Sequence, residues 1–347
     1  GSGLFGISFE KEGGKAYMQY STFAAIDIGS YDVILEIFEI SKKQGIRSVD
    51  KICHRMELGK DTYTLGKIRP EMEEELCRVL ADFVRIMEGY RVDDYRATAS
   101  SAISEASNSL YVLGKIHQLT GFSVTVLSNS EQRFLSYKAL AAMEDNFNKI
   151  IEKGTAILDL DGGSFQISLF DKDALVTTQN IRMGSLRIRE RLAGIQSETE
   201  HYEEMVEELI WNEVSSFKKM YLKDRKIENI MLIGDVFTDS VYQNIEEKTT
   251  KIISRENFNT WYEKIIRQSP MELAVKLGIP LENASLMYPS AVIYKCLIDM
   301  MGAEHIWIPG VHMTRGIAYE YAEQMKLLKG GHNFENDILM AAKNIGK

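Results

Sequence analysis

The chain has 347 residues, and 45% of them are hydrophobic, which is enough apolar material for two ordinary cores. A formal net charge of −9 argues against general nucleic-acid binding. The three cysteines lack metal-site or disulfide spacing, and no apolar run reaches the roughly 18 residues of a membrane span. The composition therefore predicts a two-domain cytoplasmic protein with reduced thiols, no membrane contact and no nucleic-acid partner.

The first 17 residues are rich in glycine and begin Gly-Ser, as a tag or leader would. We therefore exclude residues 1–17 from the functional interpretation. Beyond them we expect a first lobe at residues 18–142, a second lobe at residues 143–329 and a C-terminal helical tail at residues 330–347.

A β-hairpin is predicted at the start of the first lobe. The apolar segment Phe23–Ile28 contains Asp27 and leads through Gly29 and Ser30 into the apolar segment Val33–Phe38. An apolar strand, a tight turn and a second apolar strand are typical of a hairpin. The segments that follow alternate between amphipathic helices and short strands, which favours an α/β fold.

The same pattern returns about one domain length later. The segment Ala156–Leu160 contains Asp159 and leads through an Asp-Gly-Gly-Ser turn into Phe165–Phe170. Glycines at such a turn let backbone N–H groups approach a phosphate, and a neighbouring aspartate can hold a divalent cation or a water. One copy alone is compatible with an ordinary Asp-Gly turn. Two copies predict an internally duplicated protein with a phosphate clamp between its lobes.

The order of these segments resembles the exopolyphosphatase/guanosine pentaphosphate phosphohydrolase (Ppx/GppA) family. The resemblance extends over roughly residues 23–322. Besides the two hairpins it rests on further segments, among them Ala97–Asn108, Val126–Glu131, Met183–Arg187 and Ala284–Pro289. It implies a duplicated actin-like (ASKHA, ribonuclease H-like) α/β fold with a ligand cleft between two lobes, and a homodimer is expected on the same ground.

That family removes the terminal phosphate of inorganic polyphosphate or the 5′ phosphate of guanosine pentaphosphate, usually with magnesium. The chemistry depends on positioning and charge neutralisation, because the transferred phosphoryl group carries spread negative charge. The resemblance implies that Glu131 activates or positions the attacking water, and that Asp27 and Asp159 hold Mg²⁺ (or Mn²⁺). The residues that would hold phosphate are Gly29, Ser30, Gly162, Gly163, Ser164 and Arg187.

The chain departs from the family pattern at several of these motifs. Bulk or negative charge replaces small groups at both hairpins, Ser104 stands where the family has an arginine, and Gln132 replaces the second glutamate of the motif around Glu131. The other altered positions are Tyr31, Asp32, Asn129, Asp161, Phe165, Gln166 and Thr314. A carboxylate beside a phosphate is repulsive by about 1 kcal/mol at about 4 Å in water, and by more in a drier cleft.

These departures motivate a second hypothesis. The chain would then be a catalytically degenerate family member that binds a nucleotide, an alarmone, polyphosphate or a protein as a sensor or scaffold. A third hypothesis is a sugar or acid kinase of the same superfamily, although the sequence around Gly234 lacks the glycines of an adenosine pocket.

Several candidate residues also have an ordinary structural interpretation. Ser128 and Glu131 have the spacing of a capping box at a helix start. Asp161 lies two residues after Asp159, so both carboxylates are expected on one face and could share a metal, but Asp161 could equally make a local turn contact. The arginines that follow the second hairpin could line a polyanion channel or form a solvated helix face. They are Arg182, Arg187, Arg189 and Arg191.

Overall fold

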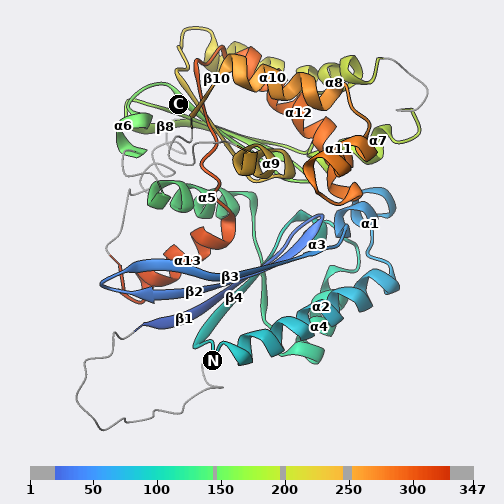
Figure 1. Ribbon diagram of the computed structural model, residues 1–347, viewed down its shortest axis with the longest axis vertical. Coiled ribbons are helices and arrows are strands. Elements are labelled where there is room, and N and C mark those ends of the chain that lie inside the picture. Colours follow the sequence, from blue (N-terminus) through green and yellow to red (C-terminus); the bar gives the residue numbers. More distant parts are fainter. Residues whose placement is uncertain (1–19, 144–146, 196–200, 245–251, 329–347) are drawn as a thin grey trace.

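The computed structural model describes residues 20–143, 147–195, 201–244 and 252–328 (Figure 1). The expected leader at residues 1–17 and the expected tail at residues 330–347 therefore lie outside the described residues. Figure 1 shows two lobes, one above the other, each built on one sheet. No helix in the described part of the chain is long and apolar enough to cross a membrane.

The first lobe is built on a five-stranded sheet in the order β3-β2-β1-β4-β5. Its strands are β1 (Ser21–Ile28), β2 (Asp32–Ser41), β3 (Gly45–Arg55), β4 (Asp94–Ala99) and β5 (Val124–Val126). The first three are antiparallel, and β4 and β5 run parallel to β1. Its helices are α1 (Leu58–Leu65), α2 (Pro70–Gly89), α3 (Ser101–Ser104) and α4 (Ser109–Thr120).

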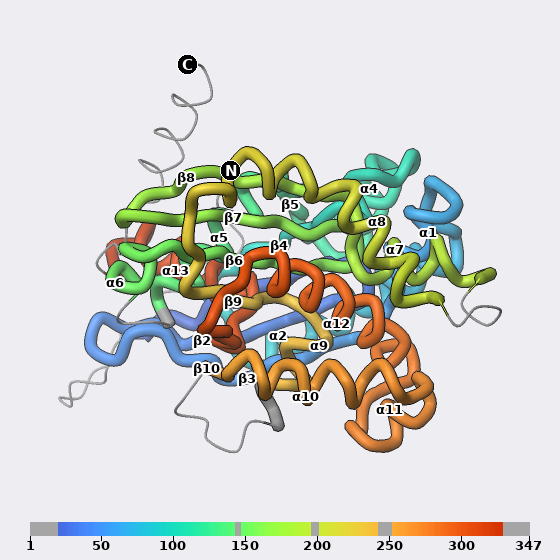
Figure 2. Tube along the Cα trace, turned by 90° about the horizontal axis from the view of Figure 1, so that it is seen from above, coloured from blue at the N-terminus to red at the C-terminus, as the bar shows by residue number. Residues whose placement is uncertain are grey.

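The second lobe is built on a six-stranded sheet in the order β10-β11-β9-β6-β7-β8. Its strands are β6 (Thr155–Leu160), β7 (Phe165–Asp171), β8 (Ala174–Ile181), β9 (Asn229–Ile233), β10 (Ile252–Ser254) and β11 (His305–Trp307). Figure 2 shows β8, β7, β6 and β9 lying side by side in this order.

The helices that follow β5 cover this sheet or lie between the lobes. They are α5 (Asn129–Met143), α6 (Phe147–Ile151), α7 (Ser185–Leu192), α8 (Tyr202–Phe217), α9 (Val236–Asn244), α10 (Arg255–Ile266), α11 (Pro270–Leu277), α12 (Leu281–Met301) and α13 (Met313–Gln324). A π-helical turn at Lys218–Leu222 continues α8.

The two sheets share one topology. The order β3-β2-β1-β4-β5 in the first sheet corresponds to β8-β7-β6-β9-β11 in the second, with the same pattern of antiparallel and parallel neighbours. Strand β10 is an antiparallel addition at the edge beside β11. Both predicted hairpins are present, as β1–β2 and β6–β7, and the prediction of a duplicated actin-like α/β fold is confirmed.

Helices α5 and α13 form the layer between the two sheets (Figure 1). Although α5 follows the first sheet in sequence, its Tyr137 and Leu140 pack with Ile157 of the second sheet. Helix α13 returns to the first sheet, where the Tyr321 ring stacks on Phe23 with ring centroids 4.1 Å apart. The lobes are therefore connected by two helices that each pack on the sheet from the other half of the chain.

We expect the Gly316→Ala variant to lower the free energy of unfolding by roughly 1–3 kcal/mol, because helix α13 crosses α5 there without room for a side chain. A Cβ at position 316 would collide with the carbonyl oxygen of Leu135, which is backbone and cannot move aside. The matched control is Gly114→Ala in α4, where nothing lies within 4 Å and helix propensity favours alanine. Urea denaturation of both variants checks this. Equal stabilities would contradict it.

Candidate functional site

A cavity of about 620 Å³ lies between the lobes, at the ends of both hairpins. Asp27 is the second-last residue of β1, and Asp159 holds the equivalent place in β6, so the duplicated topology brings the two carboxylates to one cavity. Asp161, one residue past β6, lines the same cavity, as does Gly29. The three predicted metal ligands thus line one cavity, and their binding of a metal stays a prediction.

Burial and mutual repulsion keep these carboxyls partly protonated. Burial, together with the nearby charges of Asp32 and Asp161, raises the pKa of Asp27 to about 8. Burial also raises the pKa values of Asp159 and Asp161 to about 6. The Ser136 hydroxyl donates to Asp159 at 2.7 Å and opposes this shift. A divalent cation in the cavity would favour the ionised form of each group.

Cations line the outer part of the same cavity. Lys51 and Arg55 of β3 are exposed, and Arg315 of α13 is half-buried with an Nε that has no hydrogen-bond partner. Within the described ranges none of the three side chains forms an ion pair. His312, which also lines the cavity, pairs with Asp239 at 3.3 Å. The cavity therefore places aspartates next to unpaired cations, as a complex of a metal and a polyanion requires.

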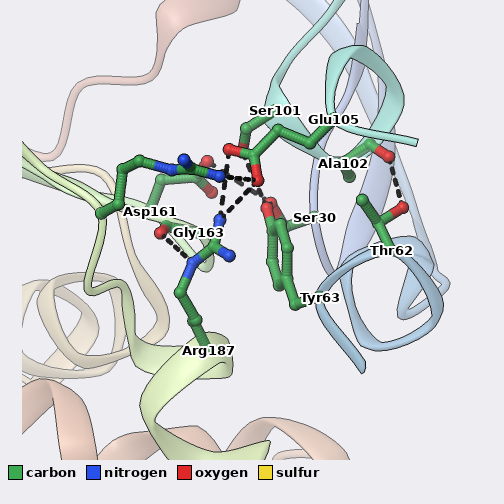
Figure 3. A network of polar contacts seen from close by, with 10 residues as sticks. Ser30, Thr62, Tyr63, Ser101, Ala102, Glu105, Asp161, Gly163 and Arg187 are labelled. Carbon is green, nitrogen blue, oxygen red and sulfur yellow. Dashed lines mark hydrogen bonds and ion pairs between the residues drawn. The ribbon is translucent and has the colours of Figure 1, made fainter. Parts of the chain in front are cut away.

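Gly29, Tyr31 and Asp161 of the hairpin turns line this cavity, whereas Ser30, Gly162, Gly163 and Ser164 do not, because the two turns pack on each other there (Figure 3). The Ser30 hydroxyl is hydrogen-bonded to the Tyr63 hydroxyl at 2.8 Å and donates to Asp161 at 3.4 Å. A Cβ at Gly163 would collide with the Tyr63 hydroxyl. A Cβ at Gly162 would lie 2.8 Å from the Ser30 Cβ. The glycines thus permit a close approach, but of protein side chains. With Ser164 also buried, phosphate binding by these turns stays a prediction.

The arginines after the second hairpin contact the first lobe. Arg182 and Arg187 both bind the Glu105 carboxylate, with N–O distances of 2.6 and 3.0 Å. Arg189 binds Glu57, also of the first lobe, at 2.8 Å. Arg191 is exposed and forms no ion pair in the described structure. The first three arginines therefore connect the lobes, although the Arg182 side chain stays largely exposed.

Glu131 lines a different pocket, of about 540 Å³. Its carboxylate accepts a hydrogen bond from the Ser128 backbone N–H at 2.7 Å, and the Ser128 hydroxyl accepts from the Glu131 N–H at 3.2 Å. This is the predicted capping box, and its hydrogen bonds lower the pKa of Glu131. The catalytic role of Glu131 stays a prediction, but in this conformation its carboxylate is held at the helix start.

The next residue, Gln132, does line the main cavity, and Ser136 follows it one helical turn later. The sequence did not predict Gln132 as a functional residue. Its position at the second glutamate of the family motif is the feature that indicates a role in the cavity. Since adjacent helical residues point about 100° apart, the choice between positions 131 and 132 decides which pocket a carboxylate reaches.

Three comparisons place the chain among known proteins. The model of the Ppx/GppA phosphatase family matches residues 36–325. The bifunctional 3-dehydroquinate synthase/phosphatase of Fusobacterium nucleatum is 21% identical over 310 residues, which are 82% of this chain and 44% of that protein. Exopolyphosphatase 1 of Mycobacterium leprae is 25% identical over 144 residues, 41% of each protein. The chain thus spans less than half the length of these curated relatives.

The fold also matches solved structures. An exopolyphosphatase from Cytophaga hutchinsonii superimposes with a TM-score of 0.77 at 17% identity, covering 90% of this chain and 100% of that one. Since the family model matches most of the chain and the topology agrees, the protein belongs to the Ppx/GppA phosphatase family.

Proposed function

We propose that the protein is a metal-assisted phosphohydrolase that removes a terminal phosphate from inorganic polyphosphate or guanosine pentaphosphate. One observation carries the proposal: aspartates from both hairpins and cations that form no ion pair within the described ranges line one interlobe cavity. Phosphoryl transfer needs positioning and neutralisation of spread charge, which this arrangement supplies. Family membership and the names of the relatives, an exopolyphosphatase and a phosphatase, support the same chemistry.

The donor set fits Mg²⁺ or Mn²⁺. Both ions prefer oxygen ligands, and Mg²⁺ usually keeps several waters while using one or two carboxylates plus phosphate oxygens. Asp27 and Asp159 would hold the ion, with Asp161 beside them. No three acidic, histidine or cysteine side chains among the described residues form a ready-made metal cluster, so waters and substrate oxygens would have to complete the site. When bound, the metal supplies charge neutralisation.

Residues of the chain would bind the phosphate groups and orient the attacking water. Arg55, Arg315 and Lys51 would bind the phosphate chain from the outer side of the cavity. Asp159 would hold the metal, whose charge favours the ionised carboxylate, and that carboxylate can also accept a hydrogen bond from the attacking water. The Gln132 amide can orient that water but cannot take its proton.

A binding protein without turnover is the second candidate function. The cavity-facing position of the family's glutamate motif carries the uncharged Gln132, and Tyr31 and Tyr63 cover the hairpin turns. These observations favour a polyphosphate or nucleotide sensor. The hydrolase and the sensor differ only in whether the bound phosphate compound is hydrolysed, which phosphate release measures.

Phosphate release from long-chain polyphosphate and from guanosine pentaphosphate, with Mg²⁺ or Mn²⁺, tests the hydrolase. We expect Asp159→Asn to lower kcat by roughly 10²-fold or more, because the variant loses a charged metal ligand. Glu131→Gln should keep kcat within about threefold if the carboxylate acts only as the cap of α5. Loss of activity in Glu131→Gln with normal folding would confirm the predicted catalytic role of Glu131. No release by the unmodified protein would favour the sensor.

The double variant Glu131→Gln/Gln132→Glu moves one carboxylate by one residue at constant net charge. If the cavity lacks a strong base, a glutamate at position 132 should raise metal-dependent kcat by about 10-fold or more. Glu131→Gln alone is the matched control, since both variants lose the same cap. Equal rates for the two variants would show that position 132 takes no part in activating water.

Stability should depend on pH and on metal. The pKa of Asp27 is about 8 in the folded protein against an ordinary 3.8, so the folded state binds more protons. Stability from this group is present at low pH and is lost as the pH rises through 8. We expect Tm without divalent cations to fall between about pH 5.5 and 8.5, and Mg²⁺ to raise it most at the alkaline end.

Asp27→Asn should flatten this pH dependence, whereas the exposed Asp173→Asn should leave it unchanged. Thermal unfolding followed by circular dichroism over this pH range makes the comparison. A Tm that rises with pH in the absence of metal, or equal slopes for the two variants, would contradict the assignment of the effect to the buried carboxyls.

A further inference from the structure

We propose that the Glu105 carboxylate occupies an anion site on Arg182 and Arg187, and that a phosphate group displaces it and opens the hairpin turns to ligand. The inference rests on the proposed function only in one respect: the opened site would bind the phosphate of the proposed substrate. In the described structure, Glu105 is the carboxylate bound by both arginines. It comes from the first lobe and they come from the second, so the contact is also a latch between the lobes (Figure 3).

The site around Glu105 has the composition of an oxyanion site. The Nη2 of Arg187 donates to both carboxylate oxygens of Glu105, at 3.2 and 3.0 Å, and Arg182 adds a donor at 2.6 Å. The Arg187 guanidinium lies 3.9 Å from the centre of the Tyr63 ring, and its Nε donates to the Gly163 carbonyl at 2.9 Å. The guanidinium is thus fixed by groups other than its anion, which preorganises it for another oxyanion.

The same contacts cover the residues that the sequence predicts to bind phosphate. Tyr63, under Arg187, places its hydroxyl between those of Ser30 and Ser101, at 2.8 and 2.7 Å, and against Gly163. The covered residues are Ser30, Gly162, Gly163 and Arg187, and none of them lines the cavity. Asp161 lines the cavity and also accepts a hydrogen bond from Ser30. If Tyr63 moved away from the second hairpin, the cavity would therefore extend past Asp161 to the covered residues.

The latch is weak enough for a ligand to open. The side chains of Arg187 and Glu105 are 21% and 26% exposed, and that of Arg182 is 67% exposed, so water and salt screen the pairs. A phosphate group carries more negative charge than one carboxylate and offers three oxygens to the two guanidiniums. The second interlobe pair, Arg189 with Glu57, contacts neither turn but joins α7 to the start of α1, so it would also have to break if the lobes part there.

Glu105→Gln tests the proposal through binding of tripolyphosphate, measured by calorimetry with EDTA so that turnover plays no part. Removal of the competing carboxylate should tighten binding by at least about threefold. The matched control is Glu190→Gln, whose carboxylate pairs with Arg189 of the same helix and connects nothing across the lobes. Adding Arg187→Gln to Glu105→Gln should abolish the gain. Equal or weaker binding by a folded Glu105→Gln protein overturns the proposal, because a merely structural ion pair predicts that result.

The unmodified chain supplies a second measurement that no folding defect can obscure. Saturating tripolyphosphate should enlarge the radius of gyration in small-angle scattering, whereas sodium chloride at equal ionic strength should not. An unchanged or smaller radius, or no binding, overturns the proposal. Tighter binding by Glu105→Gln without phosphate release by any variant would reject the hydrolase and keep the latch. Release by the unmodified protein with unchanged binding would do the reverse.

Discussion

The direct contact between the two hairpin turns is the constraint on which the cleft depends. A Cβ at Gly162 would lie 2.8 Å from Ser30 and 3.1 Å from Tyr31, so the turns approach at a distance that only glycine permits. This contact closes one end of the cavity and holds Asp27 and Asp159 facing the same space. The residue type that favours phosphate binding at a turn, glycine, here also permits protein-to-protein packing.

The added carboxylates of the cavity do not act as fixed negative charges. Burial raises the pKa of Asp161 to about 6 and that of Asp235 to about 7, so bound protons neutralise part of the negative charge of these carboxyls near neutral pH. Against burial, the hydrogen bond and charge of His312, together with the charges of Lys51 and Arg55, lower the pKa of Asp239. The added aspartates therefore produce a cavity whose charge depends on its occupant. A bound cation would release protons from the carboxyls, and a bound anion would meet the cations that form no ion pair within the described ranges.

The sequence predicts most of what local patterns determine. Apolar segments joined by turns that contain glycine and serine predict both hairpins, and duplication places Asp27 and Asp159 together. It does not predict contacts between residues distant in sequence. Arg187 meets Glu105 only because the lobes face each other, and sequence shows no link between them. The sequence also does not predict that Glu131 and Gln132 face different pockets. A shift of one residue on a helix moves a side chain from one pocket to the other while the sequence pattern stays the same.

The two ends of the interlobe contact have different strengths, which gives the cleft a direction of opening. At one end α5 and α13 interlock where Gly316 meets the Leu135 carbonyl, and the apolar packing around them is buried. At the other end α1 faces α7 through hydroxyls, the partly exposed pair of Arg187 with Glu105, the pair of Arg189 with Glu57 and a close approach of Gly59 to Leu186 (Figure 1). Because buried apolar packing resists separation more than screened ion pairs do, lobes that part at α1 would turn about the α5–α13 contact. Gln132 and Arg315, on these two helices, would then stay beside the cavity while the hairpin turns become accessible.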